Sequence, residues 1–382
     1  MVKICLFLIV KNESNTITRC LNSAKNLIDY VCITDTGSTD KTIEVIKEWE
    51  KQNNIPCAVY ESPFKDFGYS RTMSYYNACK SFPDTDYYLV LDADIIIKSN
   101  GFDKNSLTLD FYSVIQKNNR IKYWNFRFFK STKRWKCVGL VHEFWASLDQ
   151  VTHDYIDENI LEIIDIDDGG NKITKTERET TLLLKGINDP STPFALKSRY
   201  YFYLGTTKYV NKDYFAAIDI YQKRIDCAGW DEEVFVSQYN IGNCYRKLAK
   251  KDKEKAEMYT SCAVDHYMRS WGYKRDRVEP LYRIAKIYRR KKLYKHALMI
   301  LDIAKSQPDV KNVLFVEYKV YKYLIDFEYM LNAFCVDDKR KESKKIYEKL
   351  CSMKHELEPK YVTILDVNKE TFSKIDENNN FI

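Results

Sequence analysis

The stretch YYLVLDADIII, residues 87–97, decides the fold expected for this chain. Its aromatic and β-branched residues favour a buried strand, which two carboxylates interrupt. Residues i and i+2 of a strand point to the same side, so Asp92 and Asp94 are expected to project together where the strand ends. Two ionised carboxylates so placed repel each other unless a cation lies between them, and Mg²⁺ or Mn²⁺ prefers such oxygen ligands. A strand end with two hydrated aspartates is the alternative interpretation.

The segments before this stretch alternate between strand and helix. Apolar runs indicate strands at Ile4–Val10, Tyr30–Thr34 and Cys57–Glu61. Amphipathic segments between them indicate helices, one of which covers Tyr69–Cys79. This order predicts an α/β domain with a Rossmann-type, mostly parallel sheet and flanking helices. Ligands of such sheets bind beyond the carboxyl ends of the strands, so the polar residues that follow each strand are expected to meet at one edge.

Length and composition narrow the class of protein. A chain of 382 residues is long enough for two domains, and a net charge of +7 spread over it does not indicate nucleic-acid binding. No apolar run reaches the roughly 18 residues of a membrane span, and Ile4–Val10 is interpreted as a first strand, so no transmembrane segment is expected. The 11 cysteines are scattered without a C-x-x-C pair, which predicts free thiols in the cytoplasm, or in the host cytoplasm for a viral protein.

Three segments of the chain resemble the signatures of family 2 glycosyltransferases, namely Ile9–Glu13, Ile33–Thr42 and Leu91–Asp94. The middle segment, D-x-G-S-T-D-x-T after a buried strand, is the most specific. The resemblance covers roughly residues 3 to 145. It implies a GT-A-like fold, a nucleotide-sugar donor with a UDP-sugar favoured, and Mn²⁺ or Mg²⁺ as cofactor.

The same resemblance implies roles for residues around the donor. Asp35 is expected to accept a hydrogen bond from the base, commonly from uracil N3–H, because a carboxylate can only accept. Asn12 and Glu13 are expected to line the base and ribose pocket. Arg71, on the helix before the aspartate strand, is a candidate for contact with the diphosphate, and helix packing is its equal alternative.

Further residues are assigned to the metal and the acceptor. Asp92 is expected to contact the ribose or the metal, and Asp94 to bind the metal directly. The pair His142 and Glu143 resembles a V-H-E element of bacterial and viral relatives. His142 is a candidate for the metal shell or a phosphate, and Glu143 for the general base of an inverting transfer, whereas a His–Glu pair that merely finishes a strand is the alternative. The acidic run Asp165–Gly170 competes as a source of a base or ligand, as a lid, or as a flexible loop.

The strand pattern stops near Lys175, and helical repeats are expected from there on. The surroundings of Gly205, Gly242 and Ala285 fit degenerate copies of the tetratricopeptide pattern. We therefore predict a GT-A nucleotide-sugar-binding catalytic domain at residues 1–180 and a tetratricopeptide-like helical repeat domain at residues 181–382. The repeats are candidates for docking an acceptor, for forming a homodimer, or for completing the fold alone.

Together these features predict a metal-dependent, inverting glycosyltransferase that moves a sugar from a nucleotide-diphosphate-sugar to a glycan or a protein or peptide acceptor. One alternative is a catalytically inactive nucleotide-sugar-binding scaffold that acts through its repeats. The other is a nucleotidyltransferase, which shares the α/β layout and the need for a metal. The absence of a Gly-rich basic loop after the first strand counts against the latter.

Overall fold

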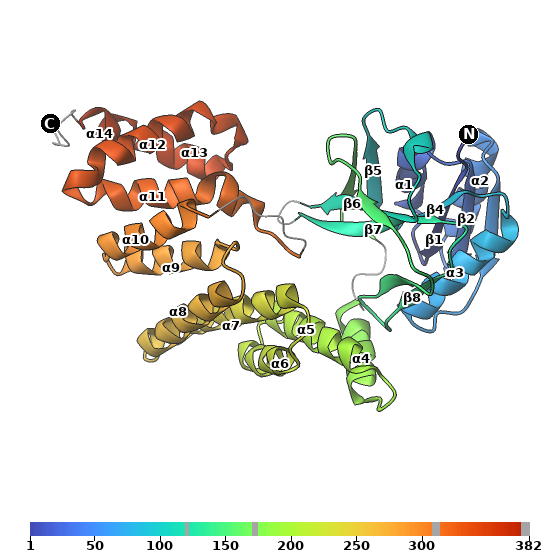
Figure 1. Ribbon diagram of the computed structural model, residues 1–382, viewed down its shortest axis with the longest axis horizontal. Coiled ribbons are helices and arrows are strands. Elements are labelled where there is room, and N and C mark those ends of the chain that lie inside the picture. Colours follow the sequence, from blue (N-terminus) through green and yellow to red (C-terminus); the bar gives the residue numbers. More distant parts are fainter. Residues whose placement is uncertain (119–121, 170–174, 308–313, 376–382) are drawn as a thin grey trace. The chain divides into compact units, whose positions relative to one another are not determined.

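The computed structural model describes residues 1–118, 122–169, 175–307 and 314–375 (Figure 1). The chain divides into two compact units, Met1–Thr207 and Lys208–Ile382. The first unit contains a sheet with flanking helices, and the described part of the second contains helices alone. The prediction of an α/β domain followed by an all-α domain is therefore confirmed. The boundary expected after residue 180 falls inside helix α4, Lys175–Asn188.

One half of the main sheet is parallel and the other half is mixed. The parallel half has the order β3 (Cys57–Glu61), β2 (Tyr30–Asp35), β1 (Ile4–Val10) and β4 (Tyr87–Val90). The mixed half continues with β7 (Lys122–Lys130), β6 (Phe111–Lys117), β11 (Leu161–Asp165) and β5 (Ile95–Ser99), and β10 (His153–Tyr155) pairs with β6. A separate hairpin is formed by β8 (Trp135–Val138) and β9 (Phe144–Ser147).

Strand β1 is buried on both sides, and its alternating side chains enter two different cores. Ile4, Leu6 and the other even-numbered apolar residues pack with helices α1 (Ile17–Ala24) and α2 (Thr42–Asn53). Phe7 faces the opposite way, into a cluster formed by helix α3 (Phe67–Ser81) and the β8–β9 hairpin. This period of two is what a central strand covered by helices requires.

The strand that was expected to end at Asp92–Asp94 ends earlier, because β4 stops at Val90. The isoleucines after Asp94 form β5, which does not pair with β4 but lies at the far end of the strand order and pairs with β11. Strand β5 also contacts α1, where Ser23 Oγ accepts the Ile97 backbone N–H at 3.1 Å. Residues 91–94 therefore connect two distant strands of a curled sheet.

The second half is built from helices, and from α6 onward consecutive helices among those described contact one another. The helices are α5 (Phe194–Val210), α6 (Tyr214–Asp226), α7 (Asp231–Lys251), α8 (Ala256–Tyr273), α9 (Glu279–Arg290), α10 (Tyr294–Lys305), α11 (Ile325–Phe334), α12 (Arg340–Ser352), α13 (Pro359–Val367) and α14 (Lys369–Ser373). Gly242 lets α8 approach α7, because a Cβ there would lie 2.6 Å from the Tyr267 ring. The tetratricopeptide assignment stays a prediction.

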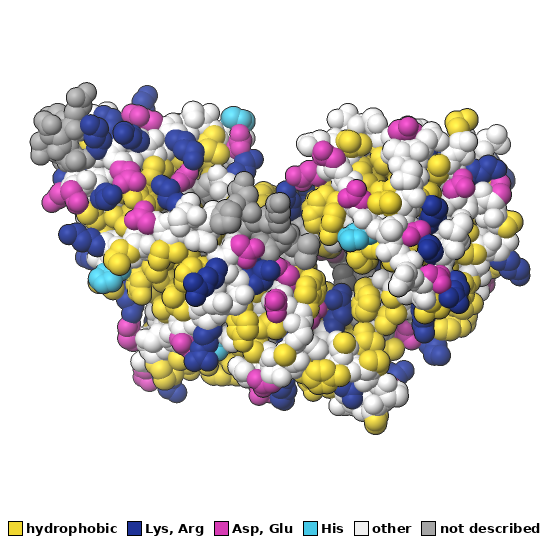
Figure 2. All heavy atoms as spheres, in the orientation of Figure 1, with side chains coloured by type: hydrophobic (Ala, Val, Ile, Leu, Met, Phe, Trp, Pro, Cys, Tyr) yellow, Lys and Arg dark blue, Asp and Glu magenta, His cyan; other side chains and the backbone are white. Residues whose placement is uncertain are grey.

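Basic and acidic side chains are interspersed over the face seen in Figure 2, as expected from the modest net charge of +7. Within the described ranges, none of the helices combines the length and the apolar character that crossing a membrane requires.

Candidate functional site

Polar residues follow three neighbouring strands at the carboxyl edge of the parallel sheet. Val10 of β1 pairs in register with Asp35 of β2, and Phe7 of β1 pairs with Val90 of β4. Glu13, Asp35 and Asp94 therefore emerge at the same edge, within two strand spacings of roughly 5 Å each. These three predicted site residues therefore lie along one edge of the sheet.

Four carboxylates, Glu13, Asp92, Asp94 and Asp165, form what we call the acidic edge. Partial burial, followed by the charges of Asp92, Asp165 and Glu13, raises the pKa of Asp94 to about 6. Asp165 ends β11 and pairs in register with Ile95, directly after Asp94. A Cβ on Gly169 would lie 3.1 Å from Asp94 Oδ2 and 3.2 Å from Glu13 Oε1, so these oxygens face one small space.

The acidic edge fits a hard divalent cation through its donor chemistry. Mg²⁺ is usually held by one or two carboxylates, with substrate phosphates and water completing its shell. Burial and the neighbouring carboxylates raise the pKa of Asp94, and a bound cation would offset both effects. Within the described ranges, three or more His, Cys, Asp or Glu side chains do not come together as a ready metal site. A cation here would thus depend on the donor for part of its shell.

Arg71 connects the aspartates to the expected general base. Its Nη2 donates to Asp92 Oδ1 at 2.5 Å, and its Nε donates to Glu143 Oε1 at 2.5 Å. Burial opposes the charge of Arg71, but the two carboxylates outweigh it and raise the pKa of the guanidinium. Both donors face protein carboxylates, so Arg71 holds Asp92 and Glu143 at fixed positions. This geometry adds a positioning role to the diphosphate contact expected from the sequence.

A second buried arginine lies on the other side of Asp92. Arg127 of β7 is 4% exposed, and its Nη1 lies 3.9 Å from Asp92 Oδ2. Its Nη2 donates to Gln116 Oε1 at 2.5 Å, and Gln116 Nε2 donates to Asp165 Oδ2 at 3.3 Å. The network therefore joins Glu143 to Asp165 beneath the acidic edge. Sequence reasoning missed Gln116 altogether, and the signal for Arg127 was a lone charge in an aromatic strand.

The loop between β8 and β9 presents Glu143. Gly139 and His142 have positive φ angles of 113° and 51°, so the turn is sharp. Helix α3 approaches so closely that a Cβ on Gly68 would lie 2.4 Å from the Gly139 carbonyl oxygen. From the other side, Tyr200 of α5 accepts the Leu140 N–H at 2.9 Å. Both ends of the loop are therefore held by helices.

His142 belongs to an aromatic stack. Its ring lies flat on Tyr203, with centroids 3.7 Å apart and planes 7° apart. Arg199 of α5 donates from Nε to the His142 carbonyl at 2.8 Å and covers the Tyr203 and Phe144 rings. His142 does not enter a metal-ligating cluster among the residues described. Sequence reasoning missed Arg199 and Tyr203, because it assigned their helix to the other domain.

The expected base-binding residues shape the loop after β2. Asp35 is 3% exposed, and its carboxylate accepts from the Ser38 N–H at 3.0 Å and from Ser38 Oγ at 2.5 Å. Asn12 has a φ of 57°, and its side-chain oxygen accepts the Thr39 N–H at 2.7 Å. Two carboxylate oxygens can accept more bonds than Ser38 supplies, so the loop contacts leave capacity for a base.

The acidic run after β11 is tied to helix α1. Asp165 lies in the strand, and Arg19 donates to both carboxylate oxygens of Asp168, at 2.8 and 2.5 Å. Gly169 lies against the acidic edge as described above. Gly170, the last residue of the predicted run, lies outside the described residues.

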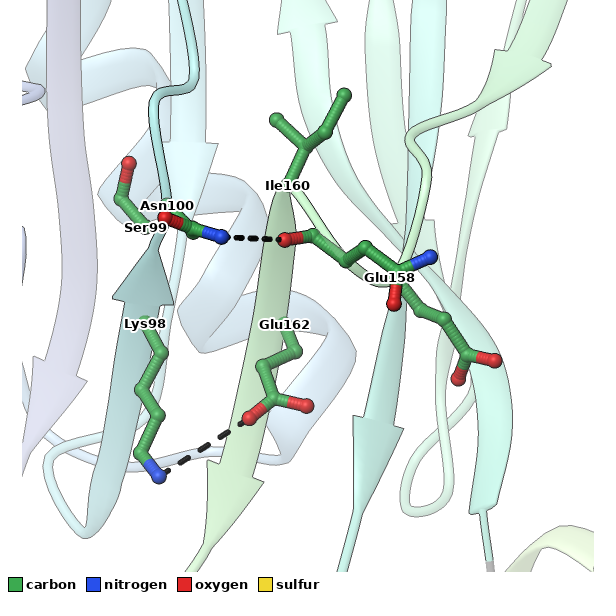
Figure 3. Close-up of a pocket in the computed structure, with 7 residues that line it drawn as sticks. Lys98, Ser99, Asn100, Glu158, Ile160 and Glu162 are labelled. Carbon is green, nitrogen blue, oxygen red and sulfur yellow. Dashed lines mark hydrogen bonds and ion pairs between the residues drawn. The ribbon is translucent and has the colours of Figure 1, made fainter.

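A pocket of about 500 Å³ lies at the other end of β5 and β11 (Figure 3). Its lining includes Lys98, Asn100 and Glu162, and Asn100 Nδ2 donates to the Asn159 carbonyl at 3.3 Å. Lys98 is four residues from Asp94 along β5, about 13 Å in an extended strand. This pocket is therefore separate from the acidic edge.

These features define a Rossmann-type α/β domain with a ligand edge of carboxylates and buried arginines. Residues 5–104 match the family model described as Glycosyl transferase family 2. The N-terminal unit therefore contains a glycosyl transferase family 2 domain, and the resemblance found in the sequence is confirmed.

Two of the similar proteins are named glycosyltransferases. An uncharacterized glycosyltransferase of Rickettsia typhi is 30% identical over 168 residues, which are 41% of this chain and 53% of that protein. The SPbeta prophage-derived glycosyltransferase SunS of Bacillus subtilis is 30% identical over 110 residues, 28% of this chain and 24% of that protein. The crystal structure of S. aureus TarS aligns with 68% of this chain and 55% of its own, at 11% identity and a TM-score of 0.37. The chain spans at most about half the length of the curated relatives it matches.

Proposed function

We propose that the protein is a metal-dependent, inverting glycosyltransferase that takes a sugar from a nucleoside-diphosphate sugar, with a UDP-sugar favoured. The observation that carries this proposal is the acidic edge, which gathers at the carboxyl ends of the strands and has Glu13, Asp92 and Asp94 within the residues that match the family 2 model. Asp35 accepts a hydrogen bond from the base, and Asn12 and Glu13 line the base and ribose.

Asp94, with Asp92, holds Mn²⁺ or Mg²⁺. The cation supplies neutralisation of the diphosphate as it leaves. Arg71 keeps Asp92 and Glu143 apart at fixed positions, and its charge adds to the positive field at the diphosphate.

Glu143 acts as the general base. The acceptor hydroxyl attacks the anomeric carbon, its proton passes to Glu143, and the bond from that carbon to the diphosphate oxygen breaks. Glu143 Oε1 is held by Arg71, which leaves Oε2 as the proton acceptor. The stack of His142, Tyr203 and Arg199 fixes the backbone beside this carboxylate.

The acceptor is a glycan or a protein or peptide, and the helical unit serves acceptor docking or homodimer formation. All 11 cysteines are free thiols, which supports the cytoplasm as the compartment.

The test is release of nucleoside diphosphate from a panel of UDP-, GDP- and dTDP-sugars with and without Mn²⁺. We expect a UDP-sugar to be consumed, and Asp94→Ala to lower the rate about 100-fold or more. Asp154→Ala, at an exposed position of β10, is the matched control and should leave the rate unchanged. Glu143→Gln should lower turnover by a similar factor and preserve the thermal shift that the donor produces, since the amide oxygen can still accept the hydrogen bond from Arg71 while the proton acceptor is lost.

The alternatives give different products. A nucleotidyltransferase would release pyrophosphate from a nucleoside triphosphate, and an inactive scaffold would bind the donor without consuming it. The absence of a thermal shift with every nucleotide would contradict donor binding itself.

A further inference from the structure

The helical unit carries a row of cations on helices α7 and α9. Arg246 and Lys250 are four residues apart on α7, and Lys286 and Arg290 are four residues apart on α9. Residues at that spacing lie on one side of a helix, about 6 Å apart along its axis. Arg283 of α9 donates from Nε to the hydroxyl of Tyr239 on α7 at 2.7 Å, so the two helices meet through their side chains. We call Arg246, Lys250, Lys286 and Arg290 the α7–α9 basic face.

The carboxylates near this face are bound to other groups. Glu317 pairs with Arg283, Glu328 with Arg289, and Glu257 with Lys291. Asp252, just after α7, accepts the backbone N–H groups of residues 254 and 255 instead. Across the described ranges, no carboxylate oxygen lies within 4 Å of a cationic nitrogen of the basic face.

The uncompensated charge is costly to the protein. Burial lowers the pKa of Lys286 to about 8 against the attraction of Glu328, and among the described residues its Nζ donates to the Tyr282 hydroxyl, at 3.0 Å. The charge of Arg246, followed by burial and by Arg290, lowers the pKa of Lys250. Arg246 Nε is buried and makes no hydrogen bond to a described residue. A surface whose cations make no direct ion pair with a described carboxylate gains stability from an external anion.

We propose that the α7–α9 basic face docks an acidic peptide segment. In an extended peptide, side chains i and i+2 point to the same side about 6.6 Å apart, close to the 6 Å spacing of the cations along each helix. The cation pair on each helix therefore matches a short segment with alternating Asp or Glu residues. Guanidinium groups add paired N–H donors that fit carboxylates. The interaction lies wholly within residues 208–382 and does not depend on the proposed transfer reaction.

The test uses the full-length chain and fluorescence anisotropy with a labelled dodecapeptide of alternating Glu and Ser. Wild-type protein should bind it, and Lys250→Glu combined with Arg290→Glu should weaken binding at least tenfold, because both side chains are exposed and reversed in charge. Lys345→Glu combined with Lys369→Glu changes the net charge equally at exposed positions on α12 and α14, and should bind as wild type does. A Lys250→Gln and Arg290→Gln variant should fall between them.

Three results would overturn the proposal. They are the absence of binding to the Glu–Ser peptide, an equal loss in the α12–α14 control, and equally tight binding of an oligothymidylate of the same charge. The last would make the face a general polyanion site. Circular dichroism melting of each variant shows whether weaker binding comes from the changed surface charges or from unfolding of the protein.

Discussion

At the scale of single residues, Asp94 is held in a protein environment that disfavours its charge. Its pKa of about 6 lies above the ordinary aspartate value, so the folded state binds the proton more tightly than the unfolded state does. The stability gained from that proton is present below about pH 4 and is lost as the pH rises through about 6. At neutral pH, a ligand-free protein therefore retains a repulsion that a bound cation would remove.

Asp94→Asn should consequently stabilise the metal-free protein while it abolishes transfer. Because Asp94 is partly exposed and solvent screens it, we expect a gain of about 1 kcal/mol in the free energy of unfolding at pH 7.5, and no gain at pH 4. Urea unfolding in the presence of a chelator measures both values. Asp154→Asn on the exposed strand β10 is the control. A variant less stable than wild type at pH 7.5 would show that the acidic edge is already compensated.

Sequence reasoning found the residues whose spacing is local and missed those whose pairing is long-range. Asp92 and Asp94 were predicted to lie together from the period of two of a strand, but both lie in the turn between β4 and β5, so that local geometry is not the one expected. Asp165 reaches the same edge only because β11 pairs with β5 in antiparallel register, which depends on the whole sheet. Arg127 was visible as a charge in an apolar strand, yet its partner Gln116 lies on a strand that the periodicity did not indicate. The roles given to Asp35, Arg71 and Glu143 remain predictions.

At the scale of elements, the first strands were predicted almost residue by residue. The runs at Ile4–Val10 and Cys57–Glu61 match β1 and β3 as expected: β1 is a central parallel strand and continuously apolar, and β3 is an edge strand whose sequence is still largely apolar. The strands of the mixed half were harder to predict from the sequence. Strand β11 was interpreted in part as an acidic loop, since its polar end dominates the pattern, and only pairing with β5 and β6 makes it a strand.

The contact between helix α3 and the loop that carries Glu143 is a close backbone approach, so a methyl group at Gly68 should be expensive. Gly68→Ala places Cβ 2.4 Å from the Gly139 carbonyl oxygen, and we expect a loss of about 2–3 kcal/mol in stability together with reduced turnover. Gly272→Ala, on helix α8 with no atom within 4 Å of the added Cβ, should instead gain about 0.4–1 kcal/mol. Denaturant unfolding compares the two. Equal effects at both positions would contradict the close approach.

At the scale of the whole molecule, the sequence separated an α/β part from a helical part because the strand pattern ends near Lys175. The limit of the first compact unit lies later, at Thr207. Helix α5 explains why the predicted boundary falls too early, because its periodicity alone is typical of the helical repeats. Its Arg199 and Tyr200 side chains, however, bind the loop at residues 139–143, which periodicity cannot indicate.

This difference predicts how the chain can be divided. A fragment of residues 1–210, which ends with α5, should fold and give the same thermal shift with the preferred nucleotide sugar as the full chain does, because every residue of the candidate site lies within it.

A fragment of residues 1–180 cuts α4 and removes the Tyr200 hydroxyl and the Arg199 guanidinium from residues 140 and 142. It should melt at least about 5 °C lower, since each lost hydrogen bond contributes about 1 kcal/mol and the Tyr200 ring that packs on Gly186 is lost as well. Scanning calorimetry of both fragments provides the measurement. If the shorter fragment melts with the longer one and binds equally well, α5 belongs to the helical unit alone and the loop needs no support from it.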